Sequence, residues 1–171
     1  MLLHRAVIGC ILAVGLAACG EPGSSVTVAS GHVAVGSPAP DFSATTLDGR
    51  VIKLSSLKGK PVLLNFWATW CTNCRVEMPA IQAAWERHHA DDLQVLAIDF
   101  RESDVAAQRR FLQEVGAKFP SVLDPDGKIA DAYGVSVGLP ASVFIDRAGV
   151  VAFVQIGPMT PDFIEEHLSQ L

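Results

Sequence analysis

The chain has no excess of positive charge, few cysteines and no long apolar run, and each shortage excludes a class of protein. Its 171 residues include 13 Lys and Arg against 18 Asp and Glu, for a net charge of −5, so an extended basic face for a nucleic-acid backbone is not expected. Four cysteines are too few for a small scaffold held together by several disulfides. Half of the residues are hydrophobic, which excludes a disordered polar chain, and the length suits one globular domain with a short leader.

The N-terminal region has the pattern of a secretory leader. After a short basic start, the apolar run 6–18 is shorter than the about 20 residues needed to cross a bilayer. Residues 16–19 (LAAC) resemble a bacterial lipobox, and the resemblance implies cleavage before Cys19 and lipidation of its thiol. We therefore expect residues 1–18 to be a lipoprotein signal peptide and residues 19–34 to be a flexible tether. The alternative is an ordinary signal peptide with an incidental cysteine; both interpretations place the mature chain outside the cytoplasm, where disulfides persist.

Residues 35–171 alternate between apolar runs and helical patterns. The runs 61–67 and 93–100 are typical of strands covered on both faces. A helix is expected over 72–89, with one face formed by Val76, Ile81, Ala84, Trp85 and His88. The other expected elements are a hairpin over 44–54, a helix over 104–115 with Ser103 as N-cap, a short helix ending at Tyr133, strands over 142–146 and 150–155, and a last helix after Thr160. This order predicts an α/β domain with a mixed sheet and helices on both faces.

Cys71 and Cys74 lie where the first buried strand meets the helix that follows it. A spacing of three residues brings the two sulfurs to one side of a helix, where they can form a disulfide. Free N–H groups and the positive end of the helix dipole stabilise a thiolate at Cys71, and the thiolate is the attacking form in disulfide exchange. We expect Cys71 to be exposed and to attack a partner disulfide, and Cys74 to be shielded and to attack the resulting mixed disulfide.

The sequence around this pair resembles a known active site. Residues 65–75 (NFWATWCTNCR), followed by Glu77-Met78-Pro79, are similar to the active-site segment of the thioredoxin superfamily and more closely to that of the TlpA/ResA-type membrane-anchored thiol–disulfide oxidoreductases. Segments 39–42, 124–127 and 138–142 resemble the same group in matching order. The resemblance covers residues 35–171. It implies an α/β thioredoxin fold, with a mixed central sheet flanked by helices and an added N-terminal β-hairpin.

The resemblance also implies a place for the substrate. Pro140 precedes an expected strand at the position where the family has a cis-proline facing the cysteine pair. A cis bond there would expose the backbone of Leu139 for strand-like pairing with a substrate segment. Trp67 and Trp70 are expected to pack and to shield rather than to react. The expected substrate-binding residues are Trp70, Leu139 and Pro140.

An acid–base group is expected beside the cysteines. Thioredoxins usually carry a buried Asp where this chain has Asn65, which cannot take a proton. In TlpA/ResA-like proteins a buried Glu after the second strand takes that role, and Glu102 is the matching position. Glu102 is therefore the expected proton acceptor for Cys74, with Asp99 as the second choice. The alternative is that Glu102 is a solvated loop carboxylate.

Other chemistries fit the sequence less well. A structural zinc site needs four ligands, and the expected mature domain offers only the one cysteine pair; a c-type haem attachment needs His where Arg75 stands. A peroxiredoxin-like peroxidase shares the Ala-Pro-Asp-Phe opening but has a different reactive motif. A copper-delivering thioredoxin-fold protein usually has three residues between its cysteines, where this chain has two, and adds a downstream His, for which His167 is the candidate. A purely structural disulfide closing so short a loop would stabilise little.

The sequence thus predicts an extracytoplasmic, lipid-anchored bacterial thiol–disulfide oxidoreductase with no cofactor and no metal. The resemblance favours reduction as the direction, for example in cytochrome c maturation. Expected partners are exported proteins that carry a disulfide or thiols, apocytochrome c among them, and a membrane thiol–disulfide electron donor; nucleic acid is not expected.

Overall fold

The structure is a computed structural model, and it describes residues 26–28, 33–136 and 138–171. The signal peptide and the proposed lipidation site at Cys19 lie outside the described residues. The elements are β1 (Thr27–Val28), β2 (Phe42–Thr45), β3 (Val51–Lys53), η1 (Leu54–Leu57), β4 (Val62–Trp67), α1 (Thr72–His88), η2 (His89–Asp91), β5 (Gln94–Asp99), α2 (Val105–Glu114), β6 (Ser121–Val122), α3 (Lys128–Ala132), β7 (Ala141–Ile145), β8 (Val151–Ile156) and α4 (Pro161–Leu168).

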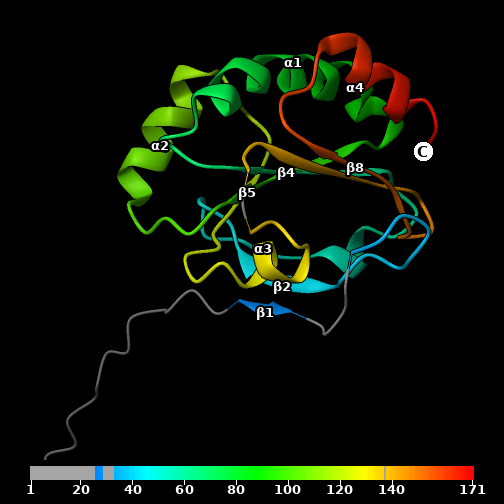
Figure 1. Cartoon of the computed structure of the whole chain (residues 1–171), viewed down its shortest axis with the longest axis horizontal. Coiled ribbons are helices and arrows are strands. Elements are labelled where there is room, and N and C mark those ends of the chain that lie inside the picture. Colours follow the sequence, from blue (N-terminus) through cyan, green and yellow to red (C-terminus); the bar gives the residue numbers. More distant parts are fainter. Residues whose placement is uncertain (1–25, 29–32, 137) are drawn as a thin grey trace, which may run out of the picture.

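A five-stranded sheet in the order β6-β5-β4-β7-β8 forms the centre of the fold. β4 pairs in parallel with β5, and β5 with β6, whereas β7 runs antiparallel to both β4 and β8. Helices α1, α2 and α4 lie on one face, and α3 lies on the other with the small antiparallel sheet β1-β2-β3 (Figure 1). The predicted thioredoxin-like arrangement, including the added hairpin β2–β3, is confirmed.

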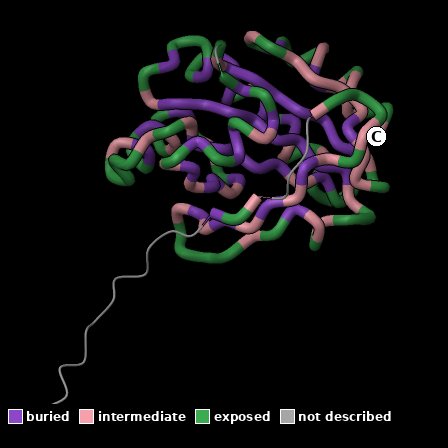
Figure 2. Tube along the Cα trace, turned by 60° about the horizontal axis from the view of Figure 1, so that its bottom comes forward, coloured by how far each residue is buried: buried purple, intermediate pink, exposed green. Residues whose placement is uncertain are grey.

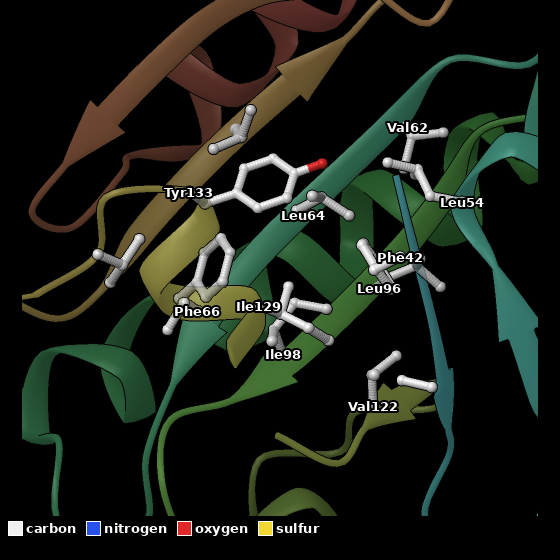
Figure 3. Packing of buried hydrophobic residues seen from close by; sticks show 14 of the residues in the cluster. Phe42, Leu54, Val62, Leu64, Phe66, Leu96, Ile98, Val122, Ile129 and Tyr133 are labelled. Carbon is white, nitrogen blue, oxygen red and sulfur yellow. The ribbon is translucent and has the colours of Figure 1, made fainter. Parts of the chain in front are cut away.

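Successive side chains of the central strands point to opposite faces of the sheet, so the interior is divided into two hydrophobic clusters. Leu64 and Phe66 of β4 point toward α3 and the small sheet, where they pack with Phe42, Ile129 and Tyr133 (Figure 3). On the other face of β4, Leu63 and Trp67 pack under α1 and α2 in a second cluster that contains both cysteines. All six residues of β4 are buried, as the continuous apolar run predicts, and the central strands form the buried centre of the trace in Figure 2.

The small sheet begins earlier than expected. Residues 26–28 were assigned to the tether, but Val26 is buried and β1 pairs antiparallel with β2. The β-branched Val-Thr-Val sequence suits an extended strand, and pairing satisfies the polar backbone groups along the edge of β2. The ordered domain therefore includes residues that lie before position 35.

Two local expectations were wrong. The N-cap of α2 is Asp104 and not Ser103, because the Asp104 carboxylate accepts the N–H of Ala107 at 2.9 Å. In α1, Val76 is exposed, whereas Glu77 and Gln82 are buried together with Met78. The buried face of α1 is thus rotated toward Glu77, which brings a carboxylate into the interior.

Within the ranges that the structure describes, every helix is too short or too polar to cross a bilayer.

Candidate active site

Cys71 and Cys74 form a disulfide at the start of α1. The chain leaves β4 at Trp67 and turns, with the N–H of Cys71 donating to the carbonyl of Ala68 at 3.1 Å. Cys71 is the N-cap of α1, and its Sγ accepts the N–H of Cys74 at 3.1 Å. In the reduced protein the same N–H and the helix N-terminus would stabilise a thiolate on Cys71, which supports the expected division of roles.

The two sulfurs differ in exposure in the expected order, but less than expected. Cys74 is 0% exposed, and Cys71 is 6% exposed. The expectation of an openly exposed Cys71 was therefore wrong for the disulfide form, because the turn and the second hydrophobic cluster enclose both residues. Trp70, the neighbour of Cys71, is 65% exposed and presents an apolar surface beside the disulfide.

The peptide bond between Leu139 and Pro140 is cis, as expected. The antiparallel register pairs Phe66 of β4 with Ala141 of β7, so Pro140 lies at the end of the sheet from which the chain turns toward Cys71. Leu139 packs against the cluster that contains both cysteines. The structure thus brings Trp70, Leu139 and Pro140 to the same end of the sheet as the disulfide.

Glu77 is a buried carboxylate that sequence reasoning missed. It is 1% exposed and lies three residues after Cys74, on the same face of α1. One of its oxygens accepts Asn65 Nδ2 at 2.7 Å, and the other accepts the N–H of Met159 at 2.9 Å. Burial raises the pKa of Glu77 to about 7, although both hydrogen bonds oppose the shift. The signal was present in the sequence, since Glu77 follows the cysteine pair at helical spacing in the segment that resembles the family.

Asn65 connects this carboxylate to the sheet. The same Nδ2 that donates to Glu77 lies 3.0 Å from the hydroxyl oxygen of Ser142, and Ser142 stands two residues after Pro140. A hydrogen-bonded path therefore leads from α1, across β4, to the strand that follows the cis bond. Asn65 does not titrate, but it fixes the orientation of a group that does.

Glu102 has a different environment from the one predicted. It is half-buried, and its two carboxylate oxygens accept the N–H and the hydroxyl of Thr69 at 2.7 and 2.5 Å. Asp99, the second choice, is 0% exposed, and the pKa of its carboxyl is raised to about 8 by burial and by the charge of Glu102. Among the described residues, no hydrogen bond joins Glu102 or Asp99 to either cysteine.

The histidine considered for metal delivery lies in an aromatic cluster. His167 on α4 stacks against Phe163 and lies tilted against Phe153, with ring centroids 4.1 Å apart in both pairs. Its Nδ1 lies 2.8 Å from the carbonyl oxygen of Phe163. In the described ranges, no three His, Cys, Asp or Glu side chains gather in a way that could hold a metal ion.

Comparison with known proteins agrees with this geometry. The family model described as AhpC/TSA family matches residues 35–154. Thiol-disulfide oxidoreductase ResA of Bacillus thuringiensis is 39% identical over 137 residues, which cover 80% of this chain and 78% of that protein. A solved protein of Chlorobium tepidum, described as a thiol:disulfide interchange protein of the DsbE kind, is 33% identical with a TM-score of 0.74 and covers 81% of this chain and 97% of its own. StoA from Bacillus subtilis is 27% identical with a TM-score of 0.65, and the match covers 78% of this chain and 98% of the StoA chain.

The structure has a disulfide at a helix N-terminus and a cis-proline at the same end of the sheet. Both features are consistent with the thiol–disulfide chemistry for which these relatives are named. The chain belongs to the AhpC/TSA family and is a thiol–disulfide oxidoreductase of the ResA/DsbE type, with Cys71 and Cys74 as its Cys-x-x-Cys pair.

Proposed function

We propose that the protein reduces disulfides in exported proteins, with Cys71 as the attacking thiol and Cys74 as the resolving thiol. The observation that carries this proposal is the placement of Cys71 at the N-cap of α1, with Cys74 fully shielded behind it. The Cys71 thiolate attacks a partner disulfide, forms the mixed disulfide and releases one partner thiolate. Cys74 then attacks Cys71, closes the Cys71–Cys74 disulfide and releases the second partner thiol. The pair loses two electrons in each cycle, so a thiol donor must reduce it again.

We propose Glu77 as the proton acceptor for Cys74, in preference to Glu102. A shielded thiol attacks slowly unless a base takes its proton. Glu77 shares a helix face with Cys74, and its pKa of about 7 is suited to proton transfer near neutral pH. Glu102, in contrast, lies in the loop after β5, shares no element with Cys74, and binds Thr69 of the turn.

Trp70, Leu139 and Pro140 form the proposed substrate surface. Leu139 packs toward the cysteines while Trp70 offers an exposed apolar ring next to them. An extended substrate segment would pair with the backbone of Leu139 and lie against Trp70, which places its disulfide over Cys71. Apocytochrome c is the candidate partner class, on the resemblance of residues 65–75 to the TlpA/ResA type.

The proposed location is extracytoplasmic, at the membrane surface, with a lipid on Cys19 and a membrane thiol–disulfide protein as electron donor. The lipobox pattern of residues 16–19 supports the anchor. Cys19→Ala should abolish lipidation and change processing; a natural mature N-terminus beyond position 19 would contradict the anchor.

The direction of the reaction is tested by a redox titration of the Cys71/Cys74 pair against a thiol buffer. A reductase is expected to have a potential nearer to that of thioredoxin, about −270 mV, than to that of the oxidant DsbA, about −120 mV. A value near the oxidising end would instead assign the protein to disulfide formation.

A further inference from the structure

The turn that carries Cys71 is held from outside the helix by one carboxylate. Glu102, in the loop after β5, accepts the backbone N–H of Thr69 at 2.7 Å and its hydroxyl at 2.5 Å. Thr69 is two residues before Cys71 in the turn between β4 and α1. A displacement of Glu102 would therefore release the segment that positions the attacking sulfur.

Glu102 is in turn positioned by Asp99. The N–H of Glu102 donates to Asp99 Oδ2 at 3.3 Å, and the buried amide of Gln108 on α2 donates to the Glu102 carbonyl at 3.1 Å. Asp99 ends β5 beside Trp67, the last residue of β4, and its Oδ1 has no hydrogen-bond partner in the part of the chain that the structure describes. A buried carboxyl with a free oxygen beside a second carboxylate is suited to hold a proton and to donate it in a hydrogen bond.

The charges around Asp99 favour its protonated form. Burial raises the pKa of Asp99 most, and the negative charges of Glu102 in the following loop and of Asp124 after β6 raise it further, whereas α2 contributes the uncharged Gln108. The cation nearest in sequence, Arg101, is directed to Asp131 on α3.

On α1, the titratable groups near the turn are Glu77, which is bonded to Asn65 and Met159, and the two cysteines once their disulfide is reduced. Arg75 of that helix is bonded to Glu114 and lies over the ring of Phe111. An ionised Asp99 would therefore face Glu102 without a compensating cation from these elements, and the two carboxylates would repel each other.

We propose that Asp99 is a positioning residue for the exchange reaction: its proton bridges Asp99 and Glu102, and loss of that proton to solvent frees Thr69 and loosens the turn that carries Cys71. The proposal rests on the assignment of Cys71 as the attacking thiol. It gives the active-site turn a second dependence on pH, separate from that of Glu77, with the firm state on the acidic side and the loose state on the alkaline side.

The test follows the Thr69 amide by NMR in the full-length oxidised protein between pH 6 and 9.5. We expect the Thr69 resonance to shift with a midpoint near 8, the value to which the pKa of Asp99 is raised. Opening of the turn, measured by hydrogen exchange at Thr69, should increase about tenfold across that midpoint, the factor for losing one hydrogen bond to a charged group. In the reduced protein, labelling of Cys71 by iodoacetamide, read from the mass of its peptide, should show the same midpoint.

Two variants test which buried carboxylate causes the transition. Asp99→Asn keeps a neutral donor toward Glu102 and should abolish the transition. Asp124→Asn, which changes a second buried carboxylate near Asp99, should retain the transition with a lower midpoint, because the charge of Asp124 raises the pKa of Asp99. If Asp99→Asn fails to fold, Glu102→Gln serves instead, since an amide is not repelled by Asp99 and the transition should again be lost.

A transition that survives in Asp99→Asn, or that disappears in Asp124→Asn, would overturn the proposal, as would the absence of any transition in the natural sequence. The NMR arm uses the disulfide form, so it does not depend on which cysteine attacks. A transition at Thr69 without any change in Cys71 labelling would contradict the effect on the turn while leaving the proposed function intact.

Discussion

Glu77 on the helix that carries the cysteines accepts a buried hydrogen bond of 2.7 Å from Asn65 on the central strand. Asn65 cannot take a proton, so the titratable group at this contact between β4 and α1 is the one on the helix. The proposed proton acceptor therefore lies on the same helix as Cys74.

The two cysteines should behave differently when a partner disulfide is offered. Cys74→Ser should accumulate a mixed disulfide through Cys71, because no resolving thiol remains. Cys71→Ser should accumulate little, because Cys74 is fully shielded. Non-reducing electrophoresis with a disulfide-bearing substrate measures both. Equal trapping by the two variants would contradict the assignment of roles.

Glu77→Gln should slow the resolution of the mixed disulfide by about 10²-fold, the low end for general base catalysis. The carboxylate is the form that accepts a proton, so in the natural protein the rate of this step should rise with pH through the pKa of about 7 and then level off. The variant should lose that rise. Stopped-flow measurement from pH 5.5 to 9 resolves it, with Glu102→Gln as the matched control. If Glu102→Gln alone removed the rise, Glu102 would regain the role of base.

The same substitution should change the dependence of stability on pH. The folded pKa of Glu77 is raised from 4.5 to about 7, so its contribution to stability is complete below 4.5 and is lost as pH rises toward 7. Glu77→Gln should remove that loss, which amounts to at most about 3 kcal/mol in the free energy of unfolding. Urea unfolding of both proteins at pH 4.5 and 8 measures the difference. Parallel curves would show that Glu77 is not the titrating group.

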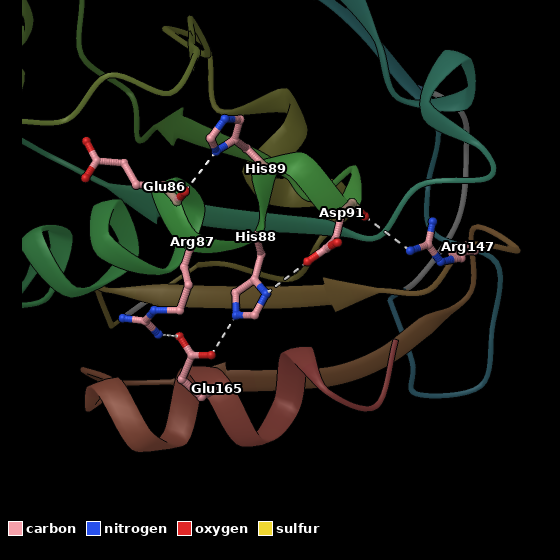
Figure 4. A network of polar contacts seen from close by, with 7 residues as sticks. All are labelled: Glu86, Arg87, His88, His89, Asp91, Arg147 and Glu165. Atoms are coloured by element: carbon pink, nitrogen blue, oxygen red, sulfur yellow. Dashed lines mark hydrogen bonds and ion pairs between the residues drawn. The ribbon is translucent and has the colours of Figure 1, made fainter.

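The far end of α1 is fastened to α4 by an ionic contact (Figure 4). His88 Nε2 lies 2.7 Å from Glu165 Oε2, and Arg87 pairs with the other oxygen. Burial is the largest single influence on the pKa of Glu165 and raises it, but the bonds and charges of His88 and Arg87 together outweigh burial and lower the pKa overall. This stabilisation is therefore present above pH 4.5 and is lost in acid.

Glu165→Gln should therefore reduce the free energy of unfolding at pH 6 by less than about 1 kcal/mol, since the contact is partly exposed. Glu166→Gln, at the exposed neighbouring position, is the control. An equal loss of unfolding free energy in the two variants would show that this contact does not stabilise the fold.

Gly127 should be intolerant of a side chain. Its φ is +71°, and a Cβ there would lie 2.6 Å from the guanidinium of Arg101, which pairs with Asp131. Gly127→Ala should cost about 2 kcal/mol, roughly half from the backbone conformation and half from displacing Arg101. Gly149→Ala has a similar φ of +82° with no contact closer than 3.5 Å, and should cost about 1 kcal/mol. Equal costs would mean that Arg101 moves away freely.

Much of the fold follows from local patterns, and the exceptions have physical reasons. The buried strands and the long helices carry strong apolar periodicity, whereas β1 and β6 have two residues each, too few for any periodicity to be seen. The burial of Glu77 could not be predicted from hydrophobicity, which places Val76 inside and Glu77 outside. Tertiary hydrogen bonds from Asn65 and Met159 reverse that order, and neither partner is a neighbour in sequence. The sequence indicates Glu102 as a candidate site residue. Its contact with Thr69 could not be predicted, because it depends on how the turn after β4 packs against the loop after β5.

If the protein is anchored at Cys19, the pairing of β1 with β2 limits how far the domain can reach from the membrane. If Cys19 carries a lipid, the chain has seven residue steps from the anchor to Val26, the first residue that is buried in the domain. Fully extended, that length spans about 25 Å, roughly half of what a tether to position 34 would allow. The domain would therefore stay within about its own diameter of the lipid surface, and a substrate would have to come to the membrane to be reduced.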